Sequence, residues 1–373
     1  MSFDKSLDSE IKNILSQGPI AGLAGGEELM SSTGDTFDVK DPGSGEKLAE
    51  VHNLQAEDVD RAVELAGQAF ENAEWAGLPV NERCVYLHRL ADEVENRKPL
   101  ISHLESMDCG KILGQAEDDV QNFIDTMRYF ADLAQNTQLR TVLAVKGHEA
   151  AYARHPWGVC GSIVPWNFPF LLCGWGIAPA LAAGNTVVVK PAEDTPLTTL
   201  YLARMVKEIG FPDGVVNVVP GLGGVTGAAL SANSKLSRMS FTGSPDVGRL
   251  VAAECGRNLV PVKLELGGKG AAVVFDDVDV PEAAQKLVEA ITFHTGQVCC
   301  DATRWLVQKP VYDEFVNEVS ERMQKVVIGY PSDEGSAMGP VVSEKQKSRV
   351  LGYLDKGIGE GAEVVLEGGS AEV

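Results

Sequence analysis

Two adjacent cysteines, Cys299 and Cys300, are the residues whose type and position most clearly suggest chemistry. They follow the polar turn at 293–298 (FHTGQV), which ends an apolar stretch of helical pattern. A thiolate attacks a carbonyl carbon readily, so a cysteine in such a turn is a candidate for covalent catalysis. The alternative is a small buried hydrophobic residue, which describes most cysteines. For Cys300 we expect packing rather than catalysis.

A carboxylate upstream could complete that chemistry. Glu265 comes at the end of an expected strand, before the turn at Gly267 and Gly268. A carboxylate at a strand end can face a cleft, and partial loss of solvent lets it activate water. A thiol and such a base are the minimum needed to make and then hydrolyse a thioester. The alternative is an ordinary surface glutamate, because most glutamates are exposed.

An amide in a stiff loop could stabilise the negative charge that this reaction develops. Asn167 lies in the segment PWNFP at 165–169, where two prolines bracket it after an expected strand. Its side chain could donate a hydrogen bond to an oxyanion. The alternative is an asparagine that only stabilises its own turn. The residues alone leave both interpretations open.

Lys190 and Glu193 follow another expected strand and suit the recognition of a nucleotide, because open α/β sheets bind ligands beyond the carboxyl ends of their strands. Glu193 could accept hydrogen bonds from both hydroxyls of a ribose. The same carboxylate would repel a 2′-phosphate, which favours NAD over NADP. A solvated surface pair is the alternative. Two glycine-rich turns, at 220–227 and 241–248, each precede an expected helix whose amides could meet a pyrophosphate, although neither fits Gly-x-Gly-x-x-Gly.

The hydrophobic pattern predicts the elements that position these residues. It predicts a hairpin over 37–51 and three helices near 57–75, 81–97 and 115–134. Beyond residue 150, strands and helices alternate, which predicts an α/β fold with a mostly parallel sheet and helices on its faces. The expected strands are 159–164, 186–189, 215–219, 238–241, 262–265 and 271–275, and the helices between them begin near residues 196, 226 and 247.

The composition narrows the class of protein. Hydrophobic residues make up 44% of the 373 residues, enough for a large core. The net charge of −21 repels nucleic acid and anionic lipid, so neither is an expected partner. The seven cysteines show no pairing pattern and the N-terminus lacks a signal peptide, which favours the cytoplasm. Histidines are few and scattered, so no metal site is expected.

Two segments have a distinctive composition. Residues 1–35 are rich in glycine and serine and are predicted to form an irregular arm. Residues 169–189 are the most apolar part of the chain, but glycines and a proline interrupt them. We therefore expect a buried element there rather than a membrane span.

Five short motifs occur in a fixed order: PWNFP at 165–169, KPAE at 190–193, FTGS at 241–244, ELGGK at 265–269 and GQVC at 296–299. From about Asp38 to the C-terminus the chain resembles the NAD(P)-dependent aldehyde dehydrogenase superfamily. The resemblance implies a Rossmann-like, parallel-sheet NAD-binding domain and a partial α/β catalytic domain. After the arm at 1–35, the first domain would span 36–265 and the second 266–373. A strand segment near 137–157, within the first, is a candidate for oligomerisation.

The resemblance also implies a role for each motif. Cys299 would be the nucleophile, Glu265 the general base, and Asn167 the oxyanion donor together with the Cys299 backbone amide. The residues implied to bind NAD are Pro165, Trp166, Lys190, Glu193, Gly223, Gly243, Ser244, Val247, Gly248 and Leu266. Glu265 favours the branch that hydrolyses its thioester over the branch that passes the acyl group to coenzyme A. The predicted function is oxidation of an aldehyde to the carboxylic acid with NAD.

The chain departs from the family pattern around the nucleophile. His294 and Thr295 precede Gly296, where an asparagine is common, and Asp301 follows at a place where alanine is usual. If the Asp301 carboxylate pointed inward, it would raise the pKa of the Cys299 thiol. We expect it to point away.

A third departure is the length. The family's Glu-x-Phe-Gly-Pro motif does not occur in the sequence, so we expect a C-terminally truncated member with apolar surface exposed in its catalytic domain. A full-length form is expected to be a homodimer or homotetramer. Phe123, Met127 and Trp175 are expected to line the aldehyde tunnel. The alternative function is a nucleotide-binding or structural protein on the same scaffold, without catalysis.

Overall fold

The structure, a computed structural model that describes residues 5–371, has a central seven-stranded sheet. Its strand order is β11-β10-β7-β8-β9-β1-β2, and the strands from β11 to β9 run parallel. These strands are β7 (Val159–Ile163), β8 (Thr186–Lys190), β9 (Val216–Val218), β10 (Arg238–Gly243) and β11 (Val262–Leu266). The predicted α/β class is confirmed, together with the strands expected at 159–164, 186–189, 215–219, 238–241 and 262–265.

Hydrophobic side chains cover both faces of the sheet, as is usual for parallel strands. Strand β8 has the sequence TVVVK, and all of its residues are buried. Val187 and Val189 pack into one core cluster, whereas Val188 packs into another. Because side chains alternate between the two faces along a strand, each face of the sheet has a core of its own.

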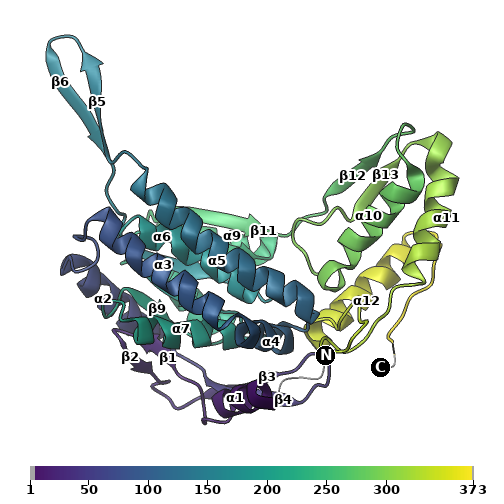
Figure 1. Cartoon of the computed structure of the whole chain (residues 1–373), viewed down its shortest axis with the longest axis horizontal. Helices are drawn as coiled ribbons and strands as arrows, with labels where there is room; N and C mark the ends of the chain where they lie inside the picture. The colour runs from purple at the N-terminus through teal and green to yellow at the C-terminus, as the bar shows by residue number, and fades with distance from the viewer. Residues whose placement is uncertain (1–4, 372–373) are drawn as a thin grey trace.

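Helices form a layer on each face (Figure 1). One layer holds α3 (Val80–Asn96), α4 (Lys98–Cys109), α5 (Leu113–Gln135), α6 (Pro169–Ala182) and α7 (Leu197–Ile209). The other holds α2 (Ala56–Glu71), the turn η1 (Gly223–Gly227), α8 (Ala228–Ala232) and α9 (Pro245–Arg257). The expected helices and helix starts are confirmed. Helix α4 is missing from the prediction because Ser102, Glu105 and Asp108, all buried, interrupt its apolar stripe.

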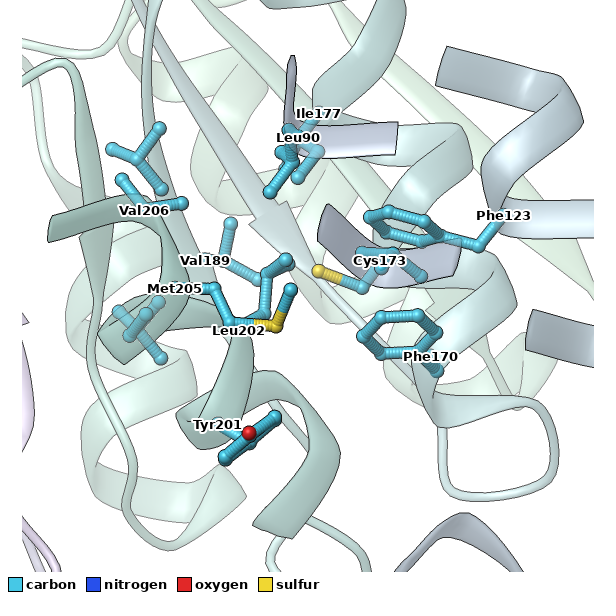
Figure 2. Packing of buried hydrophobic residues seen from close by; sticks show 14 of the residues in the cluster. Leu90, Phe123, Phe170, Cys173, Ile177, Val189, Tyr201, Leu202, Met205 and Val206 are labelled. Carbon is cyan, nitrogen blue, oxygen red and sulfur yellow. The ribbon is translucent and has the colours of Figure 1, made fainter. Parts of the chain in front are cut away.

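The larger core lies among α3, α5, α6, α7 and strand β8 (Figure 2). Phe123 of α5 stacks on Phe170 of α6 with ring centroids 4.2 Å apart, next to the buried thiol of Cys173. The apolar stretch at 169–189 forms α6 and the start of β8, so it is the buried element that its glycines predict. No helix within residues 5–371 is long and apolar enough to span a membrane.

The N-terminal segment is not the irregular arm that its composition predicts. Residues 1–4 of this segment lie outside the described residues. Its described part, 5–35, contains α1 (Lys5–Leu15) and then β1 (Gly22–Ala24) and β2 (Glu27–Leu29), which extend the central sheet. Strand β1 pairs antiparallel with β9 through Leu23 and Val218. The prediction is wrong because the glycines at 25 and 26, with φ of 58° and 80°, form the tight turn of a hairpin between two very short strands.

Two hairpins lie outside the central sheet. Strands β3 (Thr36–Lys40) and β4 (Lys47–His52) form the hairpin predicted over 37–51. Strands β5 (Arg140–Val145) and β6 (His148–Ala153) form a second hairpin that projects away from the body (Figure 1). Its exposed apolar side chains are Val142, Leu143, Val145 and Tyr152.

A smaller α/β region follows strand β11. Strands β12 (Ala271–Val274) and β13 (Arg304–Val307) form a parallel pair separate from the central sheet, so the strand expected at 271–275 exists but belongs to another sheet. The helical elements of this region are α10 (Val280–Thr292), η2 (Phe293–Gly296), η3 (Lys309–Val311), α11 (Tyr312–Met323) and α12 (Glu344–Gly359). The predicted boundary at 265/266 falls at the end of β11.

Candidate active site

The carboxyl ends of the parallel strands bring most of the predicted residues to one edge of the central sheet. In the strand register, Ile163 of β7 lies opposite Lys190 of β8, and Gly243 of β10 lies opposite Leu266 of β11. The segment PWNFP follows β7 after a single residue, Val164. Such an edge is where open α/β sheets bind their ligands, so the topology supports a nucleotide site there.

Asn167 connects this edge to the turn that carries the cysteines. Its side chain is buried, and Nδ2 donates to the main-chain oxygen of Gln297 over 2.8 Å. Gln297 lies two residues before Cys299. A side-chain amide carries two N–H donors, so one remains for a ligand. This hydrogen bond brings the predicted oxyanion donor to the predicted nucleophile's turn.

The turn before Cys299 has a strained backbone that neighbouring elements hold in place. His294 and Thr295 are in the left-handed region, with φ of 45° and 57°, where residues other than glycine are uncommon. The His294 amide donates to Gln115 Oε1 over 3.0 Å, and Thr295 Oγ1 donates to the Gly339 carbonyl over 2.9 Å. The surrounding hydrogen bonds thus fix a conformation that the turn would not adopt alone.

Both cysteines of the turn are exposed. For Cys299, exposure is compatible with a nucleophile rather than with the packing alternative. For Cys300 it contradicts the packing role that we expected, because the turn leaves both side chains near solvent. Partial burial raises the pKa of the Cys299 thiol, and the neighbouring Cys300 adds to the shift. Asp301 is not among the groups that shift this pKa. Burial raises the pKa of Asp301 itself, and within residues 5–371 its Oδ2 is buried without a hydrogen-bond partner, so the carboxylate does not simply point to solvent.

Glu265 lies on β11 opposite Thr242 of β10, at the predicted strand end. Its side chain is 52% exposed, and Oε1 lies 3.2 Å from Lys263 Nζ. The side chain is thus about half-exposed, and the role of Glu265 as a water-activating carboxylate stays a prediction. Lys263 is two residues away on the same strand, so both side chains project from the same face of the sheet. Within residues 5–371, no hydrogen bond joins Glu265 to the Cys299 thiol.

Lys190 and Glu193 form a pair at the end of β8. Lys190 is only 2% exposed, and its Nζ donates to Glu193 Oε2 over 2.8 Å. The Gly223 amide donates to Glu193 Oε1 over 3.2 Å. Burial lowers the pKa of the Lys190 ammonium, while Glu193 opposes this shift. Burial acts to raise the pKa of Glu193, but the Lys190 charge and hydrogen bond outweigh it, so the net pKa is lowered and the carboxylate stays ionised.

The second glycine-rich turn begins helix α9. Ser244 caps this helix, and its Oγ accepts a hydrogen bond from the Val247 amide over 3.3 Å. Gly243 and Val247 lie at the sheet edge and at the exposed start of the helix. Gly248 is buried, and a Cβ there would meet the Leu266 side chain at 2.6 Å. Gly248 thus allows α9 to pack closely on Leu266 of β11, which is partly buried, and the cofactor-binding role of both residues stays a prediction.

The two predicted cofactor residues that precede Asn167 differ in exposure. Pro165 is buried, whereas Trp166 is partly exposed. The Trp166 carbonyl accepts a hydrogen bond from Thr195 Oγ1 over 3.3 Å, which ties the loop after β7 to the segment after β8. This cross-link keeps the two strand-end loops side by side.

The expected lining of an aldehyde tunnel is wrong for two of its three residues. Phe123 and Met127 are fully buried in the larger core, because they lie on the inner stripe of α5 (Figure 2 shows Phe123). Trp175 is 51% exposed and borders a cavity of about 770 Å³ between α5, α6 and the sheet. Cys299, Glu265 and Asn167 are not among the residues that line this cavity.

Sequence reasoning missed the groups that lie behind Asn167. Lys111 and Asp119 are buried and ion-paired, and Lys111 Nζ donates to the Asn167 main-chain oxygen over 3.0 Å. A lysine next to an apolar helical pattern resembles any solvated surface residue. The signal that could have found it is Gly110, whose φ of 76° ends helix α4 and directs the chain inward at Lys111.

Comparisons with known proteins agree with this geometry. The aldehyde dehydrogenase family matches residues 29–373, so the likeness begins earlier than Asp38. Human aldehyde dehydrogenase 1A1 is 42% identical over 343 residues, which cover 91% of this chain and 68% of that protein. Chicken (Gallus gallus) retinal dehydrogenase 2 is 41% identical over 342 residues, covering 91% of this chain and 66% of that protein. The chain thus spans about two thirds of the length of these relatives.

Solved structures give the same result. An aldehyde dehydrogenase from Bacillus cereus superposes with a TM-score of 0.94 and 35% identity, covering 98% of this chain and 74% of that chain. A betaine aldehyde dehydrogenase from Staphylococcus aureus, in complex with NAD⁺, superposes with a TM-score of 0.93 and 32% identity over 96% of this chain and 71% of that chain. The chain belongs to the aldehyde dehydrogenase family, as its five motifs predict.

Proposed function

We propose that this protein oxidises an aldehyde to the carboxylic acid through a thioester on Cys299. The observation that carries the proposal is the hydrogen bond from Asn167 Nδ2 to the Gln297 carbonyl. It places an amide donor from the sheet edge next to the turn that presents an exposed thiol. Of the two interpretations that the sequence left open for Asn167, this contact supports the oxyanion role.

The residues at the sheet edge fit NAD. Glu193 is held ionised by Lys190 and Gly223, and a carboxylate in such a place can accept hydrogen bonds from a ribose. Gly224 has open space where a side chain would stand. The exposed N-terminus of α9 offers amides and a positive helix end to a pyrophosphate. Lys190, Glu193, Gly223, Ser244 and Val247 would hold the cofactor, with Trp166 beside it. When bound, NAD supplies the hydride acceptor that the oxidation needs.

The chain's own residues carry the other steps. The Cys299 thiolate adds to the aldehyde carbon, and the carbonyl electrons move to an oxyanion that Asn167 and the Cys299 amide stabilise. After oxidation, Glu265 accepts a proton from water as the water oxygen attacks the thioester. The C–S bond then breaks and the thiolate is restored. The Glu265 oxygen that is not paired with Lys263 can accept this proton.

Location and assembly extend the proposal. The rat relative is called a cytosolic aldehyde dehydrogenase, and the acidic chain with free cysteines suits a cytoplasmic enzyme.

The β5–β6 hairpin exposes an apolar surface and unpaired strand edges, which suit pairing with a second copy in a homodimer or homotetramer. The division into an NAD-binding domain ending at 265 and a catalytic domain from 266 follows the change from the central to the smaller sheet.

An absorbance assay tests the function. The purified chain is mixed with NAD and a short aliphatic aldehyde, and NADH formation is followed for the wild type, Cys299→Ser and Cys300→Ser. We expect Cys299→Ser to lose at least about 10³-fold in rate and Cys300→Ser, the matched control, to stay within about threefold. NAD binding without turnover in the wild type would instead favour a non-catalytic nucleotide-binding protein. Equal losses in both variants would contradict the assignment of the nucleophile.

A further inference from the structure

A fully buried cation lies beneath the loop that carries Asn167. Lys111 is 0% exposed, and its Nζ donates to the Asn167 main-chain oxygen over 3.0 Å. The same ammonium is paired with the Asp119 carboxylate and lies 3.8 Å from the centroid of the Phe168 ring. A buried lysine is costly unless its charge is matched. Here a carboxylate, a carbonyl and an aromatic face all surround it.

These contacts form one end of a hydrogen-bonded chain that reaches the nucleophile's turn. Lys111 holds the main-chain oxygen of Asn167, and the Asn167 side chain holds the Gln297 carbonyl. Gln297 is itself fixed, since Nε2 donates to the His294 carbonyl and Oε1 accepts from the Val342 amide over 3.0 Å. The main-chain oxygen of Asn167 is thus held by the Lys111 ammonium, and its side chain is held by the turn that presents Cys299.

The neighbouring buried groups keep this arrangement rigid. Glu105 of α4 accepts the Phe170 amide over 3.2 Å and the Thr198 hydroxyl over 2.7 Å, which anchors the far end of the same loop. Burial lowers the pKa of His294 well below its usual range, and the Lys111 charge adds to this, so His294 stays neutral beside the ammonium. Burial raises the pKa of Asp119, while Lys111 opposes the shift.

We propose that Lys111 is a positioning residue for the reaction. With Asp119, it holds the Asn167 peptide so that the side-chain amide stays at the turn that presents Cys299. Lys111 acts through Asn167 and does not touch the reacting atoms. The inference rests on the proposed role of Asn167 as oxyanion donor, and it adds a group that determines where that donor stands.

A double-mutant cycle tests the inference. The rate of the first hydride transfer is measured by stopped flow for the wild type, Lys111→Met, Asn167→Ala and the double variant, and NAD affinity is measured by titration. Misplacing a catalytic donor by about 1 Å can cost about 10²-fold, so we expect Lys111→Met to slow the transfer by about 10- to 100-fold with NAD affinity within about twofold. In the Asn167→Ala background the same change should cost less than about threefold. Losses of equal size in both backgrounds would overturn the proposal.

Two further variants separate positioning from folding. Lys111→Met leaves the buried Asp119 carboxylate without its partner, which can prevent folding. The pair-free variant Lys111→Met/Asp119→Leu removes both charges and should fold, yet show the same slow transfer. Recovery of the wild-type rate would overturn the proposal. Lys98→Met is the matched control, because Lys98 also contacts α5, through Gln121 over 3.0 Å, but forms no hydrogen bond to Asn167 within residues 5–371. Its rate should stay within about twofold of the wild type.

The NMR signals of Asn167 test the positioning role without any need for turnover. If the wild type shows no turnover, the proposed function is wrong, but these signals can still be measured. The side-chain amide signals of Asn167 are recorded by NMR after selective asparagine labelling and are assigned with Asn167→Ala. In the pair-free variant these signals should shift or broaden, while those of the other asparagines persist. Unchanged Asn167 signals in that variant would overturn the positioning role, whatever the activity.

Discussion

The central-sheet region and the smaller region on β12 and β13 hold their functional residues in different ways. In the central region the site residues end strands that two large core clusters bury. In the part of the chain that the structure describes, the smaller region's core cluster has four buried side chains, Val274, Val280, Ala284 and Phe315, with partly buried hydrophobic residues packed against them. Its helix α12 has no buried residue. Hydrogen bonds to Gln115 and Asn167, which belong to the central region, fix the conformation of the turn before Cys299. The large core of the central region thus helps to position the turn that presents Cys299, the proposed nucleophile, in a region with little core of its own.

Truncation of one aromatic side chain in each core should have unequal effects. Phe123 and Phe315 are both almost completely buried, but only Phe123 lies in the large cluster. We expect Phe123→Ala to lower the free energy of unfolding by about 3–5 kcal/mol. Phe315→Ala should lower it by about 3 kcal/mol or less, because a small cluster can collapse around the gap. Urea unfolding measures both values. Hydrogen exchange should show the Phe315→Ala effect confined to the smaller region, and a loss spread equally over both regions would break the comparison.

The thiol should be unreactive at neutral pH in the free protein. Alkylation requires the thiolate, and burial together with Cys300 raises the pKa of Cys299 above its ordinary value. The alkylation rate should therefore rise about tenfold per pH unit and still be rising near pH 9. Mass spectrometry after timed iodoacetamide treatment separates Cys299 from Cys300. A plateau below pH 8 would mean that the turn activates the thiol without any ligand.

The smallest effect is expected for cofactor choice in the central region. Glu193→Ala removes the carboxylate that Lys190 and Gly223 hold, and with it the repulsion of a 2′-phosphate. The preference for NAD over NADP should shrink by about five- to tenfold, or about 1 kcal/mol, in the ratio of kcat/KM values. Glu27→Ala, a change to an exposed carboxylate elsewhere, serves as the control. An unaltered ratio in Glu193→Ala would remove this residue from the ribose site.

Within the central sheet, the strands also differ in how well the sequence predicts them. Strand β8 could be located because three successive valines bounded by a lysine are typical of a strand buried on both faces. The same logic failed at the N-terminus, where β1 and β2 have three residues each. In the described part of the chain, strand β2 pairs only with β1, and β1 joins the central sheet through β9, which is far away in the sequence. Strands of three residues carry too little pattern of their own to be recognised.

The sequence predicts the site residues that lie in short motifs, but it does not predict the contacts between residues that are far apart in the chain. Cys299, Asn167, Lys190 and Glu193 could be named from short motifs and from the resemblance. The link between Asn167 and Gln297, 130 residues apart, and the Lys111–Asp119 pair behind it arise only when the chain folds. The exposure of Glu265 and its pairing with Lys263 were missed for a related reason, since a strand end fixes where a side chain starts but not what it meets.

Glu265→Gln tests the central claim, a thioester on Cys299 that Glu265 helps to hydrolyse, most directly. The variant should still release about one NADH per active site in a rapid burst, followed by turnover slowed by about 10²-fold or more, because Glu265 takes no part in the addition of the Cys299 thiolate to the aldehyde or in hydride transfer, but activates the water that hydrolyses the thioester. Mass spectrometry of the quenched protein should then find the acyl group on the peptide that contains Cys299. A steady-state rate equal to that of the wild type, or a burst without any acylated Cys299, would contradict the account.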